Sequence, residues 1–422
     1  MSRVVFLQLY RLAILIAIVG LVRVQHARLR IEGDKPVEVA EVQRWFTNAA
    51  TLTLDAGARG GLHVLDADGT EIGYVVRTSP QTDRIVGYCG MSDTLVGLDR
   101  DGRVLGLHIR KSEDTRQHVG DVNDDRHFRK TWNGLTWEQV AGMNLKKAGV
   151  EGVSGATLTS MAVAEGIVQR FRAAQSELRP SPPRVRARDV GLALVLVLGV
   201  WLTFTKCTGR ARWRQWFQWV VIGYVGFWNG DLLAQSLFAG WAGAGVGWRL
   251  APGLALLAAS AFALPWLTKR PLYCHQICPH GAAQEIISRH TPSRWRVAVP
   301  AAVDRGLRWL PGGLLAFVLI VVMLPVDFDL AGLEPFDAYL VRSAGVATIG
   351  VAVAGLIAAM VVPKAYCKYG CPTGALLEFV RGHGESDCFG RRDVVALLLV
   401  VLAFVMSWQH VALHQLIYGA AN

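Results

Sequence analysis

Long apolar runs are the feature that most limits how this chain can fold. After about residue 189 the sequence consists mostly of such runs, whereas 24–188 reads as ordinary water-soluble sequence. The whole chain is 52% hydrophobic and only 18% charged. A helix needs about 20 mostly apolar residues to cross a bilayer core. The uneven distribution therefore predicts one soluble domain and one membrane domain.

Seven apolar segments come close to this length, at 4–22, 190–205, 216–238, 250–267, 312–326, 344–362 and 393–412. Lys and Arg gather in alternate connections, whereas the connection 327–337 holds four acidic residues, Asp327, Asp329, Glu334 and Asp337. Basic connections face the cytoplasm. The pattern predicts seven crossings of a bacterial inner membrane, with 24–188 on the periplasmic or extracellular side. It places four cysteines on the cytoplasmic side, Cys274, Cys278, Cys367 and Cys371.

The expected domains are an anchor or signal segment at 1–23, an extracytoplasmic domain at 24–176, a Pro/Arg-rich linker at 177–189 and a membrane bundle of about six helices at 190–422. No small-x-small cleavage motif follows the first segment, which favours an uncleaved anchor. The net charge of +11 does not indicate a nucleic-acid partner, because the basic residues of the bundle lie between apolar runs, where topology explains them.

The extracytoplasmic part is expected to be α+β. Residues 61–76 and 84–110 alternate apolar and polar around Asp68-Gly69 and Asp101-Gly102, a pattern typical of hairpins. Residues 158–171 have the apolar spacing of an amphipathic helix. Just before that helix, Ser154-Gly155-Ala156-Thr157 forms a small-residue turn. Such a helix start suits a phosphate, and it equally suits a plain serine N-cap.

Four of the seven cysteines form two Cys-x-x-x-Cys pairs, Cys274 with Cys278 and Cys367 with Cys371. Each pair has Tyr before it and Pro after it, with Gly and Ala at matching offsets, so we interpret the two as an internal repeat. If helical, each pair presents both thiols on one face. Four thiolates would suit an iron–sulfur cluster first and a soft metal such as copper(I) second. Nearby Lys and Arg are expected to lower the thiol pKa values.

The remaining polar residues of the bundle leave several interpretations open. Asn229 and Asp231 fit either a quinone or proton site or a helix–helix contact. Cys207 and Cys388 are expected to be structural. His275 and His280 flank the first cysteine pair, and His410 and His414 have the spacing of haem ligands, although helix packing explains that pair more simply.

The stretch 151–160 resembles the signature of FMN-binding domains of bacterial respiratory membrane proteins. The resemblance implies FMN joined to Thr157 by a phosphoester bond that a flavin transferase installs, with Ser154, Gly155 and Ala156 around the phosphate. Residues 87–90, 95–102 and 112–115 also resemble that domain, which implies Glu113 and Thr115 as cofactor-binding residues. The chain has Glu151 where the family motif begins with Asp.

An exported FMN domain followed by two Cys-x-x-x-Cys-Pro motifs resembles the NosR type and the membrane flavoproteins associated with reductive dehalogenases. The fold class implied is an α+β extracytoplasmic FMN-binding domain plus a polytopic α-helical membrane bundle with an internal repeat. The function implied is electron transfer between the quinone pool or the cytoplasmic side and an exported reductase, with quinone as a further cofactor and membrane quinol as a partner. The alternative is a redox sensor or a maturation factor for an exported metalloenzyme.

Overall fold

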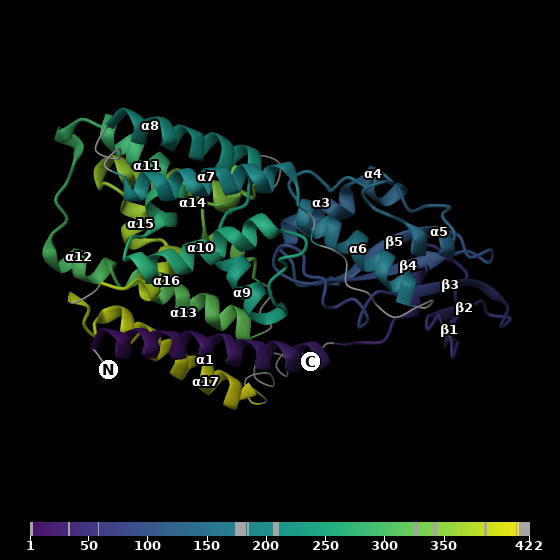
Figure 1. Cartoon of the computed structure of the whole chain (residues 1–422). Helices are drawn as coiled ribbons and strands as arrows, with labels where there is room; N and C mark the ends of the chain where they lie inside the picture. The colour runs from purple at the N-terminus through teal and green to yellow at the C-terminus, as the bar shows by residue number, and fades with distance from the viewer. Residues whose placement is uncertain are drawn as a thin grey trace. The chain divides into compact units, whose positions relative to one another are not determined.

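The computed structural model describes residues 3–32, 34–57, 59–173, 183, 185–205, 211–324, 328–340, 344–383, 386–410 and 412. The chain divides into two compact units (Figure 1). The helical unit comprises Met1–Leu29, Val185–Gly243 and Ala251–Asn422, and the sheet unit comprises Arg30–Arg184 and Ala244–Leu250. The linker expected at 177–189 lies mostly outside the described residues.

The sheet unit is built on a five-stranded antiparallel meander in the order β1-β2-β3-β4-β5. Its elements are α2 (Val39–Val42), β1 (Thr51–Leu54), β2 (Leu62–Leu65), β3 (Glu71–Arg77), β4 (Ser92–Leu98), β5 (Val104–Ser112), α3 (Arg116–Asp124), α4 (Arg126–Lys130), α5 (Trp137–Gly142) and α6 (Thr157–Ala173). Both predicted hairpins are present. Gly69 and Gly102 sit at their turns with φ of 77° and 71°, a conformation that glycine adopts without a Cβ clash.

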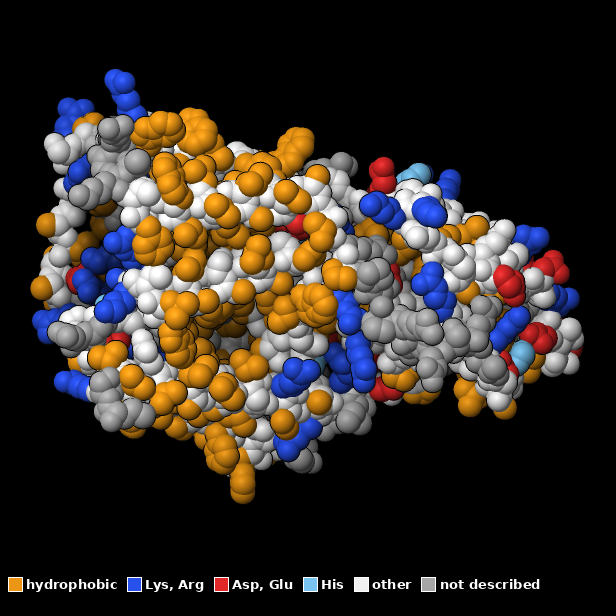
Figure 2. Space-filling model, viewed as in Figure 1, with side chains coloured by type: hydrophobic (Ala, Val, Ile, Leu, Met, Phe, Trp, Pro, Cys, Tyr) orange, Lys and Arg blue, Asp and Glu red, His pale blue; other side chains and the backbone are white. Residues whose placement is uncertain are grey.

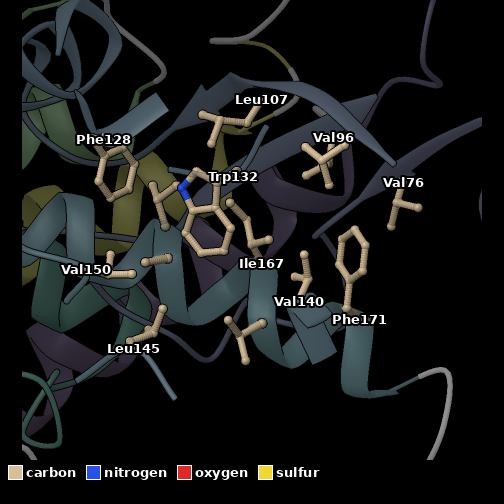
Figure 3. Packing of buried hydrophobic residues seen from close by; sticks show 14 of the residues in the cluster. Val76, Val96, Leu107, Phe128, Trp132, Val140, Leu145, Val150, Ile167 and Phe171 are labelled. Carbon is tan, nitrogen blue, oxygen red and sulfur yellow. The ribbon is translucent and has the colours of Figure 1, made fainter. Parts of the chain in front are cut away.

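Alternation along the strands gives the sheet two buried faces. Val76 and Val96 point into a cluster with Trp132 and the helices, while Val75 and Leu95 point to the segment around α2. Figure 3 shows the Trp132 indole among the side chains of the first cluster. Helix α6 runs through this core and is buried on nearly every side. The prediction of a helix was therefore right, but the prediction of an amphipathic one was wrong.

The helical unit contains many short and interrupted helices. Its α-helices are α1 (Arg3–Glu32, whose last turn belongs to the sheet unit), α7 (Ala187–Phe204), α8 (Ala211–Val220), α9 (Gln235–Ala244), α10 (Pro252–Thr268), α11 (Pro279–His290), α12 (Ala301–Leu307), α13 (Leu310–Met323), α14 (Val346–Val361), α15 (Ala365–Tyr369), α16 (Pro372–Val380) and α17 (Arg391–Trp408). The described part of this unit also contains the π-helices η2 (Val221–Asn229) and η3 (Tyr273–Ile277) and the 3-10 turns η4 (Ser293–Trp295), η5 (Leu330–Leu333) and η6 (Asp337–Tyr339).

Within the described residues, three helical segments are long and apolar enough to cross a membrane: Arg3–Arg30, Ala187–Phe204 and Ala301–Met323. Helices α10 and α14 are also apolar but shorter. Figure 2 shows hydrophobic side chains over most of the visible flank of the helical unit. Apolar surface on this scale is typical of a membrane interface.

Two predicted membrane segments differ from the structure. The first helix extends beyond 4–22 and ends at Glu32. The segment 216–238 is not one helix, because η2 ends at Asn229, Gly230 after it has a left-handed φ of 74°, and the chain has no regular secondary structure until α9 begins at Gln235. Hydrogen bonds from Leu233 N to the Tyr273 hydroxyl and from Gln235 N to Glu334 satisfy this buried non-helical backbone.

A buried ionic cluster joins the first helix to the last. The Arg11 guanidinium is 1% exposed and lies 2.8 Å from both Asp387 Oδ2 and Asp393 Oδ1. Arg392 lies 2.6 Å from Asp387 Oδ1. Helices α1 and α17 also pack through apolar side chains in two clusters. Arg11 and Arg392 together therefore balance the charge of two carboxylates that are both almost completely buried.

Replacing Arg11 with Leu should destabilise the helical unit strongly, because two buried carboxylates lose a shared cation. The expected loss is about 3–5 kcal/mol of unfolding free energy. Thermal unfolding in detergent measures it. The matched control is Arg28→Leu, since Arg28 lies in the same helix and, among the described residues, makes just an exposed hydrogen bond to Ser407 O. Equal melting temperatures for the two variants would contradict this role for Arg11.

Candidate functional site

The start of α6 is shaped by small residues. Gly155 has a φ of 89°, and a Cβ on Gly152 would lie 2.3 Å from Thr157 Cγ2. Thr157 is the first helical residue, half-buried, and its hydroxyl donates to Val153 O at 3.2 Å. The first amides of a helix have no partner inside it, and the helix dipole is positive there. This start can therefore bind an anionic group beside the Thr157 hydroxyl.

The Asp114 carboxylate connects three separate segments at this helix start. Its Oδ2 accepts from Tyr88 N at 2.9 Å and from Thr159 Oγ1 at 2.6 Å, and its Oδ1 accepts from Cys89 N at 3.1 Å. A Cβ on Gly87 would lie 2.5 Å from Asp114 Oδ2, so the 87–90 turn needs glycine there. The three stretches associated above with flavin binding, 87–90, 112–115 and 151–160, thus meet at one carboxylate.

Of the predicted residues beside Asp114, Glu113 and Thr115 have different surroundings. The Glu113 carboxylate lies 2.9 Å from the Arg30 guanidinium. The Thr115 hydroxyl is buried and has no hydrogen-bond partner among the described residues. Burial raises the pKa of Asp83, which lies 3.9 Å from the same Arg30. Glu113 therefore belongs to an ion pair at the edge of the site, and Thr115 offers a free polar group.

His118 is a residue that the sequence reasoning missed. It is 3% exposed, and neither ring nitrogen has a hydrogen-bond partner in the described part of the chain. Its ring stands edge-on to Tyr88, with centroids 5.0 Å apart. Buried polar groups are nearly always paired, so those of His118 and Thr115 fit a site for a polar ligand. The sequence signal that could have pointed to His118 is its position three residues after Thr115.

Replacing Asp114 with Asn should lower the flavin content of the purified protein. One acceptor oxygen becomes a donor and faces two existing donors, which costs roughly 1–3 kcal/mol per unpaired group. Flavin absorbance per protein measures the loss. The matched control is Asp66→Asn, because Asp66 accepts from Asp68 N and Thr70 N in an exposed hairpin turn. Wild-type flavin content in the Asp114 variant would show that the carboxylate does not organise the site.

In the helical unit, a left-handed lysine precedes each cysteine motif. Lys269 ends α10 with a φ of 65°, and Lys364 follows α14 with a φ of 56°. A left-handed residue at a helix end reverses the chain. Each helix is followed by a short helical turn that carries the first cysteine, Cys274 in η3 and Cys367 in α15.

The second cysteine of each motif begins a new helix. Cys278 is the N-cap of α11 and Cys371 is the N-cap of α16, each with Pro at the next position. The Cys278 sulfur accepts from Gly281 N at 3.4 Å, and the Cys371 sulfur accepts from Gly374 N at 3.1 Å. The shared thiol face was predicted only for a helix through each pair, and no such helix is present in this described part of the chain, because Pro279 and Pro372 start new helices.

All four motif cysteines line one cavity of about 340 Å³. Among the described residues, no three His, Cys, Asp or Glu side chains are close enough together to hold a single metal ion. An iron–sulfur cluster spreads its four thiolate ligands over several iron atoms, so it tolerates a wider spacing. The amide N–H to sulfur bonds above, with Gln284 Nε2 donating to Cys367 at 3.2 Å, suit thiolate sulfur. The residues present fit a cluster better than a mononuclear site.

Lys364 and Lys368 line the same cavity as the four motif cysteines. The lowering of the thiol pKa values by nearby positive charge stays a prediction. Metal ligation replaces thiols by thiolates, so cluster binding at these sulfurs would release protons.

The cysteine site lies deep in the bundle. A Cβ on Gly355, in the middle of α14, would lie 3.0 Å from His280 Nε2 and 3.2 Å from Tyr366 Cβ. Further along, Ser288 Oγ donates to Ala359 O at 2.9 Å, so α11 runs in the same direction as α14. The start of α11 and Tyr366, just before Cys367, therefore lie beside the middle of α14.

Other residues singled out in the sequence have varied places. His275 lines the cavity, and Cys388 is exposed. Asn229 Nδ2 donates to Asp231 at 3.2 Å, at the break after η2. His410 Nδ1 lies 2.6 Å from Gln25 Nε2, so this ring makes an interhelical contact. Cys207 and His414 lie outside the described residues.

The sheet unit thus offers an anion-binding helix start with free polar groups, and the helical unit offers a buried four-thiol cavity. Together they define a protein with membrane-type helices and two separate cofactor sites. Residues 87–170 match the FMN-binding domain family. Residues 250–298 and 344–395 match the 4Fe-4S binding domain family. The matches support a flavin and an iron–sulfur cluster as the cofactors.

One curated relative is a component of the Na(+)-translocating ferredoxin:NAD(+) oxidoreductase complex of Acetobacterium woodii. It is 28% identical over 109 residues, which cover 25% of this chain and 51% of the relative. The match thus spans about half of the relative's length. No solved structure matches the chain. These similarities support a membrane electron-transport protein that carries flavin and iron–sulfur cofactors.

Proposed function

We propose that this protein is a multi-pass electron-transfer flavoprotein of a bacterial inner membrane. In this proposal FMN is joined to Thr157, and Cys274, Cys278, Cys367 and Cys371 hold an iron–sulfur cluster. The observation that carries the proposal is the pairing, in one chain, of the Asp114 junction within the FMN-binding match and the four-cysteine cavity within the 4Fe-4S match. Flavin exchanges electrons in pairs or singly, and a cluster exchanges them singly.

The proposed orientation follows the charge pattern of the connections. Basic residues between α7 and α8, around the cysteine motifs and before α17 would face the cytoplasm, which puts the sheet unit outside. A bilayer core is roughly 30 Å thick, too far for a single electron hop. The position of the cysteine motifs beside the middle of α14 supports the proposal. A cluster held there would lie part of the way across the bilayer core, so each electron step would be shorter than the full thickness.

Each unit has a distinct task in this scheme. The α6 start would bind the flavin phosphate, and the buried groups of Thr115 and His118 would meet the polar part of the ring. In the helical unit, the amides of Gly281 and Gly374 would stabilise negative charge on the sulfurs of Cys278 and Cys371. Cys278 and Cys371 are both buried, which strengthens these hydrogen bonds.

We propose a membrane quinol as the electron donor and an exported reductase or electron-transfer protein as the acceptor. The cavity beside the cysteines has apolar side chains from α1, α13 and α17, including Leu15, Leu315 and Leu399. The same cavity is also lined by basic side chains, including Lys368 and Arg391. The apolar part of this lining suits the apolar body of a quinol. The relative belongs, by its name, to a redox complex, which supports a protein partner here.

Replacing Thr157 with Val should abolish covalent flavin, because Val keeps the shape of Thr but has no oxygen to esterify. Mass spectrometry of the peptide that contains Thr157 should show an FMN-sized adduct in the wild type and none in the variant. Thr157→Ser is the matched control, since it keeps the hydroxyl and should retain adduct. A wild-type peptide without an adduct would exclude the covalent link.

Replacing any of the four motif cysteines with Ser should remove most of the iron and stop the reduction of the flavin by a quinol analogue. Iron and acid-labile sulfide analysis, with stopped-flow spectra of the flavin, measure both effects. Cys388→Ser is the matched control, because this exposed cysteine lies outside the cavity. Quinol-driven flavin reduction at the wild-type rate in an iron-free variant would refute the proposed electron path.

A further inference from the structure

The segment Leu330–Tyr339, called the bridge below, contacts both cysteine motifs. It follows α13 and precedes α14, and it contains the two 3-10 turns η5 and η6. Glu334 in the bridge contacts Thr373 of the second motif, and Tyr339 contacts His280 of the first. His280 and Thr373 are equivalent residues, because each stands two positions after the second cysteine of its motif.

The Glu334 contact caps the start of α16 from outside that helix. Its Oε1 accepts from Thr373 N at 3.3 Å and from Thr373 Oγ1 at 2.7 Å. Pro372 has no amide hydrogen, so Thr373 supplies the first amide of α16, which has no partner inside the helix. The next amide, Gly374 N, donates to Cys371 sulfur. Glu334 and the cysteine sulfur thus take neighbouring donors of the same helix start.

The Tyr339 contact acts on the first motif. Its hydroxyl lies 3.2 Å from His280 Nδ1 in a buried hydrogen bond. The His280 ring stands edge-on to both Tyr339 and Tyr366, and Tyr366 directly precedes Cys367. His280 follows Pro279, the first residue of α11 after Cys278. Its orientation is therefore connected to the position of both motifs.

The cost of burying Glu334 argues for a specific role. Its side chain is 2% exposed, and among the described residues no Lys, Arg or His forms a salt bridge with it. Three hydrogen bonds hold it instead, the third from Gln235 N at 2.5 Å. A buried carboxylate without a cation is expensive unless its hydrogen bonds are needed where they are.

We propose that the bridge is a positioning element that sets the separation of the two cysteine pairs for cluster binding. Glu334 fixes the second pair through Thr373, and Tyr339 fixes the first through His280. The inference rests on the proposed cluster at the four cysteines. It adds that residues distant in sequence from both motifs, on a connection between two spans, determine how firmly the cluster is retained and what its reduction potential is.

The test compares Thr373→Val, Tyr339→Phe and Glu334→Gln with the wild type, all purified full-length without oxygen. Loss of a partner that orients a metal ligand typically weakens metal retention about 10- to 100-fold. We therefore expect an iron chelator to remove the cluster about tenfold faster or more from each variant. The midpoint potential of the cluster, followed by electron paramagnetic resonance, should also shift. Thr373→Ser should restore the wild-type behaviour because it keeps the hydroxyl.

Two matched controls remove the same chemical groups elsewhere in the helical unit. Thr348→Val removes a buried hydroxyl that donates to Gly345 O at the start of α14, and Tyr224→Phe removes a hydroxyl that donates to Arg188 O. Both should keep wild-type retention and potential. Because Glu334→Gln could unfold the bundle, thermal unfolding is recorded for every variant, and Tyr339→Phe and Thr373→Val test each contact separately.

The outcomes separate the two proposals. An iron-free wild type would refute the proposed cluster itself. An iron-loaded wild type together with folded bridge variants of unchanged retention and potential would refute the bridge alone. Equal losses in the bridge variants and the controls would also refute it, since the effect would then be one of general stability. Faster loss and a shifted potential only in the bridge variants would support it.

Discussion

The amide groups that begin α11 and α16 are the donors on which the cysteine site depends. A helix start leaves its first amides unpaired, and inside an apolar bundle no water is present to satisfy them. Here the sulfurs of Cys278 and Cys371 accept from one amide each, and the Glu334 carboxylate accepts from another. Short helices that begin deep in the bundle are stable because their donors have these partners. The same donors favour negative charge on sulfur.

The architecture of the sheet unit could largely be predicted from local sequence. Two Asp-Gly turns, each between segments that alternate apolar and polar residues, predicted both hairpins. The small-residue turn after Glu151 predicted the start of α6. The interactions between these elements could not be predicted. Asp114 gathers donors from residues 25 and 26 positions earlier and 45 positions later, and Glu113 pairs with an arginine 83 positions earlier. The periodicity of a sequence contains no information about such long-range pairings.

In the helical unit, composition predicted where the helices lie better than how they are interrupted. The spacing of the cysteines suggested one helical face, but the prolines that follow Cys278 and Cys371 start new helices there. The break after Asn229 was also missed, although Gly230 was its signal. A hydropathy window averages over such breaks, because the residues around them remain apolar. The depth of the site emerges only when the contacts with α14 are known.

The ion pairs of Arg11 have a consequence for how the protein is made. The chain emerges from the ribosome with α1 first, and Asp387 and Asp393 emerge more than 370 residues later. An arginine near the centre of an isolated membrane helix costs about 2.5–3.5 kcal/mol on insertion. During most of synthesis the first helix would thus carry a charge whose counterions do not yet exist. Assembly around Arg11 would be completed only once Asp387 and the start of α17 are made, and a chain truncated before Asp387 would expose the unmet charge to quality control.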